Sequence, residues 1–451
     1  IGWPSFIDWP AAHSLTHEAM YYKWVERAWK AGLRIMVNNL VENEVLCTLA
    51  SPTQGQLPIC NEMDKAMNQS TFMHRLQDYI DAQEGGPGQG WFRIVTSPQE
   101  ARQVINQGKL AVVLGIEISH LFNCDVSYLA NLSEVSGCTE TDIDQQLQRV
   151  YDAGVRQMFP LHEFDNAFGG NGIFDGTILN IGNFVDTGKF WGTYDCPADD
   201  YLYDAGAIMT TVPGLGNDPL TAQLIPILNG AVPLYSSSKK QCNARQLTDL
   251  GRYAFEQMME KKMIIEVDHL ELKIKTELLD LAESKTPIYP LVSTHGGHGG
   301  ISMAQAQRIL AGGGIIYPYK GNGRQQVEML ERLKPIRSDR YLFALGYGAD
   351  TNGMGSQADP RGSEAEPVQY PFTLFRGPGW DSKFAGISPV VFDRQRSGER
   401  VFDINAEGMA QYGLVADFVE EVRIEGGEEA LNALYDSAEG YLQMWERTLA
   451  R

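Results

Sequence analysis

Basic charge and long apolar runs are both scarce in this sequence. Its 451 residues carry 37 Lys and Arg against 57 Asp and Glu, which gives a formal net charge of −20. Nucleic acid and anionic membranes bind basic surfaces, so the charge argues against both as partners. No apolar stretch approaches the roughly 20 residues of a transmembrane helix, and the sequence therefore predicts no membrane span.

Closely spaced cysteine pairs are absent as well. None of the six cysteines forms a C-x-x-C motif, which argues against a zinc ribbon. All six lie in the first 242 residues, in loop-like surroundings, and this favours three disulfides and an oxidising compartment over unpaired thiols in a cytosolic protein. The sequence leaves the connectivity open. Pairing of sequence neighbours would give Cys47–Cys60, Cys124–Cys138 and Cys196–Cys242.

The chain shows no recognisable signal peptide, and its first residue is Ile1 rather than Met. We therefore expect that a leader has been removed or that the chain is a processed piece. Together with the cysteines, this predicts a secreted or extracytoplasmic protein.

A helix followed by an apolar strand recurs along the chain. "SPQEARQVINQGK" precedes "LAVVLGIEIS", and "ARQLTDLGRYAFEQMMEKK" precedes "MIIEVDH". Strands that are apolar throughout are typical of a parallel sheet covered by helices. The number of units favours an α/β fold of the (β/α)₈ TIM-barrel type over an open sheet. We expect a single domain over 1–451, with insertions at about 42–90 and 163–240 that form loops or small excursions on the catalytic face.

Several predicted strands run into a residue that can bind a metal ion. These residues are Glu117, His162, Asp268 with His269, His295 and Asp350. In a (β/α)₈ barrel the strand ends converge on one face, where active sites are built. Histidines with carboxylates suit a divalent ion such as zinc, and a bridging carboxylate would allow a pair of ions.

Each of these residues also has a structural interpretation. A histidine after a strand is more often a hydrogen-bonded structural residue, and Asp350 could cap a turn with Asn352. Their occurrence on five separate strand ends favours a common site. We assign His298 to the turn after its strand, because Ser302 and Gln305 predict a capping box for the next helix.

Five motifs follow one another in order from about residue 91. They are "VTSPQEARQVINQGKLAVVLGIEISH", "AGVRQMFPLHEFDNAFGG", "MIIEVDHLELK", "PLVSTHGG" and "LGYGADTNGM". Their order and spacing resemble those of the membrane (renal) dipeptidase family of zinc hydrolases, within the wider amidohydrolase-like superfamily. The C-terminal "GLVADFVEEV" and "EGYLQMWERTL" resemble the closing helices of that family.

The resemblance implies a zinc site and a reaction. By its match to the family, Glu117 would bridge two zinc ions, and His269 and His295 would complete the ligands of one of them. The reaction implied is hydrolysis of an amide or peptide bond in a small substrate by a metal-activated water.

The resemblance also implies roles for three further residues. His162 would contact the substrate and stabilise the developing oxyanion, and Asp350 would shuttle the proton. Asn352, in the same turn as Asp350, is expected to bind substrate.

One family motif is absent. The family's first strand ends in His-x-Asp or His-x-His, which supply further ligands, and this sequence has no such motif. The prediction is therefore a barrel whose first strand is missing from this chain, with one or two zinc ions. His13 and His17 have the i,i+4 spacing of helical metal ligands, but "HSLTHE" is more simply a helix start.

Three explanations for the missing strand remain open. An N-terminal segment could complete the barrel non-covalently, the chain could be a fragment, or the protein could have lost one metal and its chemistry. The leading hypothesis is an exported dipeptidase-like metal hydrolase. The alternative is a catalytically silent barrel that serves binding or assembly, and a third possibility is a metal hydrolase of lactones or cyclic amides.

Overall fold

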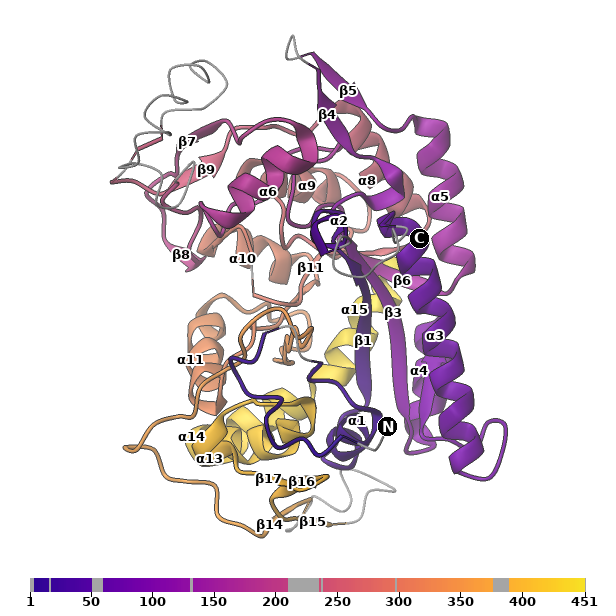
Figure 1. Cartoon of the computed structure of the whole chain (residues 1–451), viewed down its shortest axis with the longest axis vertical. Coiled ribbons are helices and arrows are strands. Elements are labelled where there is room, and N and C mark those ends of the chain that lie inside the picture. The colour runs from indigo at the N-terminus through magenta and orange to yellow at the C-terminus, as the bar shows by residue number, and fades with distance from the viewer. Residues whose placement is uncertain are drawn as a thin grey trace.

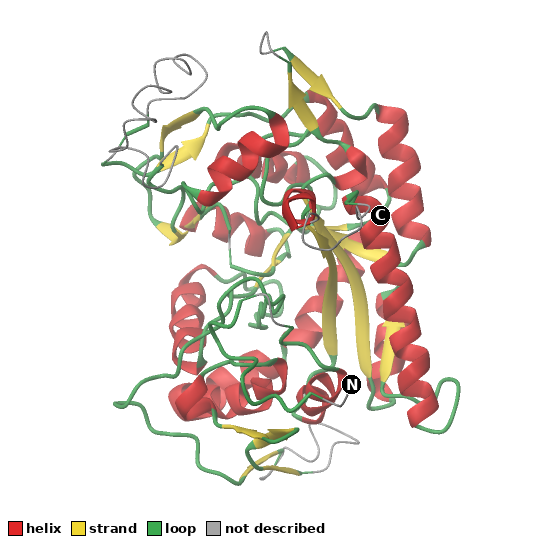
Figure 2. Ribbon diagram, in the orientation of Figure 1, coloured by secondary structure: helices red, strands yellow, loops and turns green. Residues whose placement is uncertain are grey.

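The structure is a computed structural model that describes residues 4–15, 18–50, 60–129, 133–209, 235–236, 238–296, 298–375 and 389–450. It is mixed α/β, with helices around a central group of strands (Figure 2). The helices are α1 (Tyr22–Lys30), α2 (Glu44–Ala50), α3 (Glu62–Gln83), α4 (Pro98–Asn106), α5 (Glu140–Asp152), α6 (Ile178–Thr187), α8 (Asp249–Glu260), α9 (Leu272–Glu283), α10 (Met303–Ala311), α11 (Gly323–Leu333), α13 (Ile404–Glu407), α14 (Val415–Tyr435) and α15 (Ser437–Leu449).

A series of parallel strands forms the centre of the molecule. β1 (Ile35–Glu42) pairs with β3 (Leu110–Ile118), β3 with β6 (Val155–Met158), and β6 with β10 (Ile264–Ile265). A parallel bridge from Glu266 to Val292 continues the series to β11 (Val292–Ser293), which pairs with β13 (Ile315–Ile316). A last parallel bridge joins Tyr319 to Gly348. β2 (Phe92–Val95) pairs with the first half of β3.

Within the described residues the series does not close into a barrel. No pairing is recorded among the described residues between β1 at one end and the segment around Gly348 at the other. The prediction of a parallel α/β fold is thus confirmed, whereas the closed barrel is not observed. The parallel series runs from β1 to the bridge at Gly348.

The concave side of the sheet is filled by side chains from the strands and from α15. Ala111, Val113, Val292 and Ile315 pack in one cluster with Trp445 of α15. All of these side chains are almost fully buried. Full burial of an aliphatic side chain contributes about 1.5–3 kcal/mol, so this cluster makes α15 an integral part of the sheet's core.

Local sequence signals set the starts of several helices. Ser97 caps α4 by accepting a hydrogen bond from the Glu100 N–H. Ser302 and Gln305 form the predicted capping box of α10. Such caps satisfy backbone N–H groups that have no partner within the helix.

The region predicted as an irregular insertion at 42–90 contains a long helix. α3 packs beside β1 and β2 and lies along the edge of the molecule next to α5 (Figure 1). Its amphipathicity is weak in sequence, since polar Glu62 and Ser70 are among its buried residues. Part of the second insertion, 210–234, lies outside the described residues; the rest holds α6, β7 (Thr193–Asp195) and β8 (Tyr201–Tyr203).

Several short antiparallel strand pairs lie outside the parallel series. They are β4 (Val126–Tyr128) with β5 (Glu134–Ser136), β7 with β9 (Gln241–Asn243), β8 with β12 (Ile301–Ser302), β14 (Phe372–Leu374) with β15 (Val390–Phe392), and β16 (Gln395–Ser397) with β17 (Arg400–Phe402).

The three predicted disulfides are present with sequential pairing. Cys47–Cys60, Cys124–Cys138 and Cys196–Cys242 have Cα–Cα distances of 5.6, 4.8 and 5.0 Å. Among the described helices, none has both the length and the hydropathy needed to cross a membrane.

Candidate metal centre

Three of the predicted metal ligands come from neighbouring strand ends. Glu117 is the penultimate residue of β3 and stands opposite Val41 of β1 in the parallel register. His269 follows β10, and His295 follows β11. Because parallel strands end at the same edge of a sheet, these side chains from distant parts of the sequence meet there.

The three side chains converge closely. Glu117 Oε1 lies 3.2 Å from His269 Nε2 and 3.2 Å from His295 Nε2. The two Nε2 atoms are 2.9 Å apart. One ligand atom from each residue lies within 4.8 Å of the other two, and all three residues are buried.

Burial and mutual contact shift the three pKa values in different directions. Burial lowers the pKa of His269 to about 3, further helped by the neighbouring His162 and His295. Burial also lowers the pKa of His295, but the carboxylate of Glu117 outweighs it and raises that pKa to about 10. Burial raises the pKa of Glu117, yet the histidines hold it well below its usual range. The cluster thus keeps Glu117 ionised in the interior.

This donor set fits a divalent cation. One carboxylate oxygen and two imidazole nitrogens are ligands that zinc accepts, and catalytic zinc sites use three protein ligands with an open position. The Nδ1 atom of His269 has no hydrogen-bond partner among the described residues. The charge of Glu117 is balanced by His295, and a divalent cation bound between these side chains would balance it in the same place.

Other side chains hold the cluster in place. Asp268 Oδ2 accepts a hydrogen bond from the His295 backbone N–H at 3.1 Å and lies 3.7 Å from His295 Nδ1. Ser293 Oγ donates to the other oxygen of Asp268 at 2.8 Å. Asn39 Nδ2 of β1 donates to Glu117 Oε2 at 3.0 Å. Carboxylates of this kind orient metal-binding histidines and raise their basicity.

The other predicted site residues lie next to the cluster. His162 Nε2 is 3.5 Å from Glu117 Oε1, and its ring centroid is 4.7 Å from that of His269. Asp350 and His295 line one cavity. Asn352 is exposed and donates from Nδ2 to Asp350 Oδ1 at 2.8 Å, so in this structure it fixes the orientation of Asp350.

Two site residues adopt backbone conformations that are uncommon for side-chain-bearing residues. His269 has φ 66° and Asp350 has φ 41°. Positive φ at a non-glycine residue costs free energy, and such positions concentrate at functional sites. The Lys320 Nζ atom, 3.3 Å from Asp350 Oδ2, compensates the charge of that aspartate.

The remaining histidines considered in the sequence have separate positions. The ring of His298 stacks on His269 at 4.9 Å and lies 4.4 Å from that of Tyr319, so it borders the cluster. His13 is exposed and contacts Asp359 on the surface, while His17 lies outside the described residues.

Sequence reasoning gave no role to two residues that support the site, Asn39 and Lys320. It named Asp268 as a candidate ligand at a strand end, whereas in the structure Asp268 contacts His295 and Ser293. No sequence feature marks Asn39 and Lys320 as functional, because asparagine in a strand and lysine in a turn are common residues. Only the fold brings them beside Glu117 and Asp350.

Comparisons with known proteins gave structural matches only. No family model and no curated protein matches the chain. An amidohydrolase from Pseudomonas aeruginosa is similar at 13% identity and a TM-score of 0.48, with 98% of each chain covered.

Two further similar structures are peptidases. A dipeptidase described as a metallo peptidase of family M19 has 12% identity and a TM-score of 0.47, over 97% of this chain and 91% of that one. A metallo peptidase from Rhodobacter sphaeroides, liganded with a phosphinate mimic of the dipeptide L-Ala-D-Ala, has 12% identity and a TM-score of 0.46, over 96% and 91%. A dipeptidase is thus among the structures to which this chain is similar. The functional argument below rests on the side chains of the site.

Proposed function

We propose that this protein is a metal-dependent hydrolase of a small amide or peptide substrate, of the dipeptidase type. The observation that carries the proposal is the buried convergence of Glu117, His269 and His295 at the ends of three parallel strands. Three disulfides agree with a protein that works outside the cytoplasm.

Glu117, His269 and His295 would hold a zinc ion. Bound zinc would polarise a substrate carbonyl and activate a water for attack. The Glu117 carboxylate is fixed by Asn39, and His295 is fixed by Asp268.

Two neighbouring side chains are assigned to proton transfer and charge stabilisation. Asp350 would accept the proton of the attacking water and deliver it to the leaving nitrogen, with Asn352 and Lys320 holding its carboxylate in place. His162 would donate a hydrogen bond to the carbonyl oxygen as negative charge develops there.

The proposal is tested by the metal content of purified variants. Elemental analysis of protein dialysed against zinc should give about one ion per chain. His269→Ala and His295→Ala should reduce this to near zero, because each removes one of three ligands. His13→Ala is the matched control, since His13 lies on the surface, and it should keep its zinc.

A kinetic variant separates metal binding from catalysis. His162→Ala should keep zinc and lose about 100-fold or more in kcat on a panel of dipeptides, the range found for loss of an oxyanion donor. Full hydrolysis by His269→Ala and His295→Ala would contradict the proposal. Zinc binding with no hydrolysis of dipeptides, amides, lactones or cyclic amides would favour a silent barrel.

A further inference from the structure

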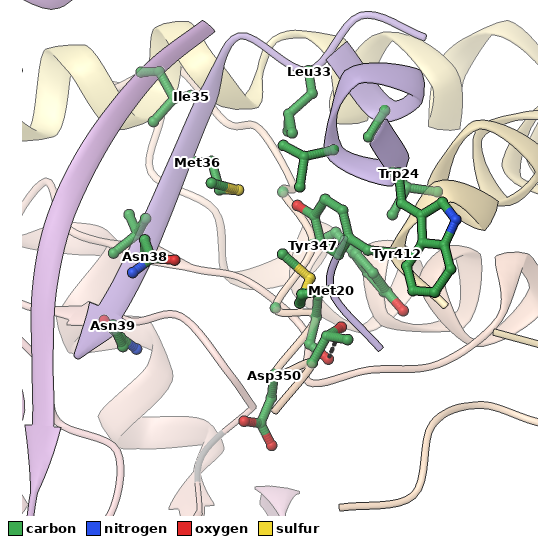
Figure 3. Close-up of a pocket in the computed structure, with 18 of the residues that line it drawn as sticks. Met20, Trp24, Leu33, Ile35, Met36, Asn38, Asn39, Tyr347, Asp350 and Tyr412 are labelled. Atoms are coloured by element: carbon green, nitrogen blue, oxygen red, sulfur yellow. Dashed lines mark hydrogen bonds between the residues drawn. The ribbon is translucent and has the colours of Figure 1, made fainter. Parts of the chain in front are cut away.

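The metal cluster has two different borders. One is a cavity of about 890 Å³ that His295 and Asp350 help to line, with Asp350 near one end of it (Figure 3). The other border consists of three aromatic side chains, Phe174, His298 and Tyr319, which we call the aromatic row. None of the three takes part in the metal binding or the proton transfer proposed for this site.

The rings of the aromatic row contact one another and the metal-ligand histidines. The ring centroid of His298 lies 4.5 Å from that of Phe174 and 4.4 Å from that of Tyr319. It also lies 4.9 Å from the ring centroid of His269 and 5.1 Å from that of His295. Such separations are those of aromatic rings in direct contact. A molecule bound at the two ligand histidines therefore lies next to the row.

The aromatic row leads from the buried cluster toward the surface. His269 and His295 are buried, His298 and Tyr319 are half-buried, and Phe174 is 38% exposed. Among the described residues, the hydrophobic clusters of the core include neither Phe174 nor Tyr319. Core packing therefore does not account for these two rings. Sites for small molecules are lined in this way, by aromatic side chains beside a few polar groups.

A close contact between two loops holds Phe174 beside His298. The Gly172 N–H donates to the His269 carbonyl at 2.6 Å. A Cβ atom on Gly172 would lie 2.2 Å from the Cα atom of Gly299, so the two backbones touch and only glycine fits there. This contact brings the loop that carries Phe174 against the turn that carries His298.

A buried lysine fixes the turn that carries His298. Lys275 of α9 is buried, and its Nζ atom donates to the carbonyls of His298 and Gly300 at 3.1 and 2.5 Å. The His269 N–H donates to the same His298 carbonyl at 2.8 Å. Because these hydrogen bonds hold the turn before a ligand arrives, binding against the His298 ring costs little ordering of the protein.

We propose that the aromatic row binds an aromatic side chain of the substrate and so determines which amides or peptides the site prefers. The inference rests on the proposed function for the class of substrate, but contact between the row and an aromatic group requires no metal. An aromatic occupant fits better than an aliphatic one, because pairs of aromatic rings gain free energy beyond that of the buried area.

The charges beside the aromatic row disfavour an acidic occupant. The Lys320 Nζ atom lies 4.6 Å from the ring centroid of Tyr319 and 3.3 Å from Asp350 Oδ2. The charge of this lysine is thus already paired with a carboxylate. An acidic side chain on the row would lie near Asp350 and would repel it. The substrate group that fits is therefore aromatic and uncharged.

The inference is tested first on metal-free protein, with N-acetyl-4-fluoro-L-phenylalanine amide as the probe. Titration followed by fluorine NMR should show saturable binding. Phe174→Ala should raise the dissociation constant about tenfold, because it removes one of the rings that contact the probe. Phe174 is exposed, so this change leaves the core intact.

Phe184→Ala is the matched control for Phe174→Ala. Phe184 belongs to the same insertion and is similarly exposed, at 39%, but it lies on α6 and stacks on Phe190. This variant should bind the probe as wild type does. Absence of saturable binding to wild type, or equal affinity in wild type and Phe174→Ala, would overturn the inference.

Two substitutions of His298 distinguish a ring contact from a hydrogen bond. His298→Phe keeps an aromatic ring and should retain probe affinity within about threefold, whereas His298→Ala should weaken it about tenfold. An equal loss in both variants would show that the imidazole nitrogens bind the probe, and this would contradict the proposed aromatic contact.

Kinetics of the zinc-loaded protein separate this inference from the proposed function. The kcat/KM values of Phe-Ala and Ala-Phe are each divided by that of Ala-Ala, and the larger ratio should fall about tenfold in Phe174→Ala. Probe binding that depends on Phe174, without hydrolysis of any dipeptide, would support the aromatic row and contradict the hydrolase. Hydrolysis with a ratio that Phe174→Ala leaves unchanged would support the hydrolase and overturn the role of the row.

Discussion

At the scale of single residues, the carboxylate of Asp268 determines how His295 is presented. It is fully buried and is held by Ser293 Oγ and by the His295 backbone N–H. Its position opposite His295 Nδ1 leaves Nε2 as the atom that faces Glu117.

Asp268→Asn should weaken zinc binding by about 10–100-fold, the range for loss of a partner that orients a metal ligand. Ser293→Ala is the matched control, because it removes only one hydrogen bond to Asp268, and it should change zinc affinity much less. Competition titration with a zinc-binding dye measures both. Equal zinc affinity in wild type and Asp268→Asn would show that His295 needs no such partner.

At the scale of elements, His120 joins three helices, α2, α3 and α6. Its Nδ1 contacts Glu44 of α2 at 3.2 Å, and its Nε2 contacts Asp186 of α6 at 2.9 Å. Its backbone N–H donates to Glu62 of α3 at 2.7 Å. Burial lowers the pKa of His120, but the carboxylates outweigh this and raise it well above its usual value.

This arrangement predicts a pH-dependent stability. A histidine with a raised folded-state pKa stabilises the fold fully below its unfolded pKa of about 6.5, and this stabilisation is lost as pH rises through the folded-state pKa. His120→Asn should therefore lower Tm most near pH 6, by an amount corresponding to roughly 1.5–3 kcal/mol for a charged hydrogen bond.

Thermal melts of both proteins from pH 5.5 to 10 provide the measurement. The difference in Tm between wild type and His120→Asn should shrink toward alkaline pH. His13→Asn, at an exposed histidine, should show no such trend. A constant difference across the range would mean that His120 is neutral in the folded protein.

At the scale of the whole molecule, the three disulfides close loops outside the central strands. Denatured, unreduced protein should show no free thiols, and six after reduction. Cys196 and Cys242 are 46 residues apart, and by chain entropy their bond contributes roughly 4 kcal/mol to the free energy of unfolding.

The Cys196→Ser, Cys242→Ser double variant should therefore unfold at a lower denaturant midpoint than wild type, with a similar slope. The Cys47→Ser, Cys60→Ser variant closes a shorter loop of 13 residues, so it should lose less stability, about 3 kcal/mol. Six free thiols in the unreduced protein would contradict the disulfide assignment.

The sequence by itself determined the alternation of helices and strands, the parallel sheet and the presence of disulfides, and it named the candidate ligands, but it left the disulfide connectivity open. These follow from local patterns, because apolar strands, capping residues and strand-end histidines are visible without knowledge of the fold. α3 escaped prediction because its buried face includes polar residues and its apolar periodicity is weak.

Only the tertiary structure decided what these elements do together. The contact of Asn39 with Glu117, the role of Lys320 beside Asp350 and the convergence of Glu117, His269 and His295 depend on which strand ends become neighbours. The cavity beside β1 is also a tertiary property, since its walls come from segments that are distant in the sequence. The structure places a cavity there, because no described segment pairs with the outward edge of β1 between Ile35 and Asn39.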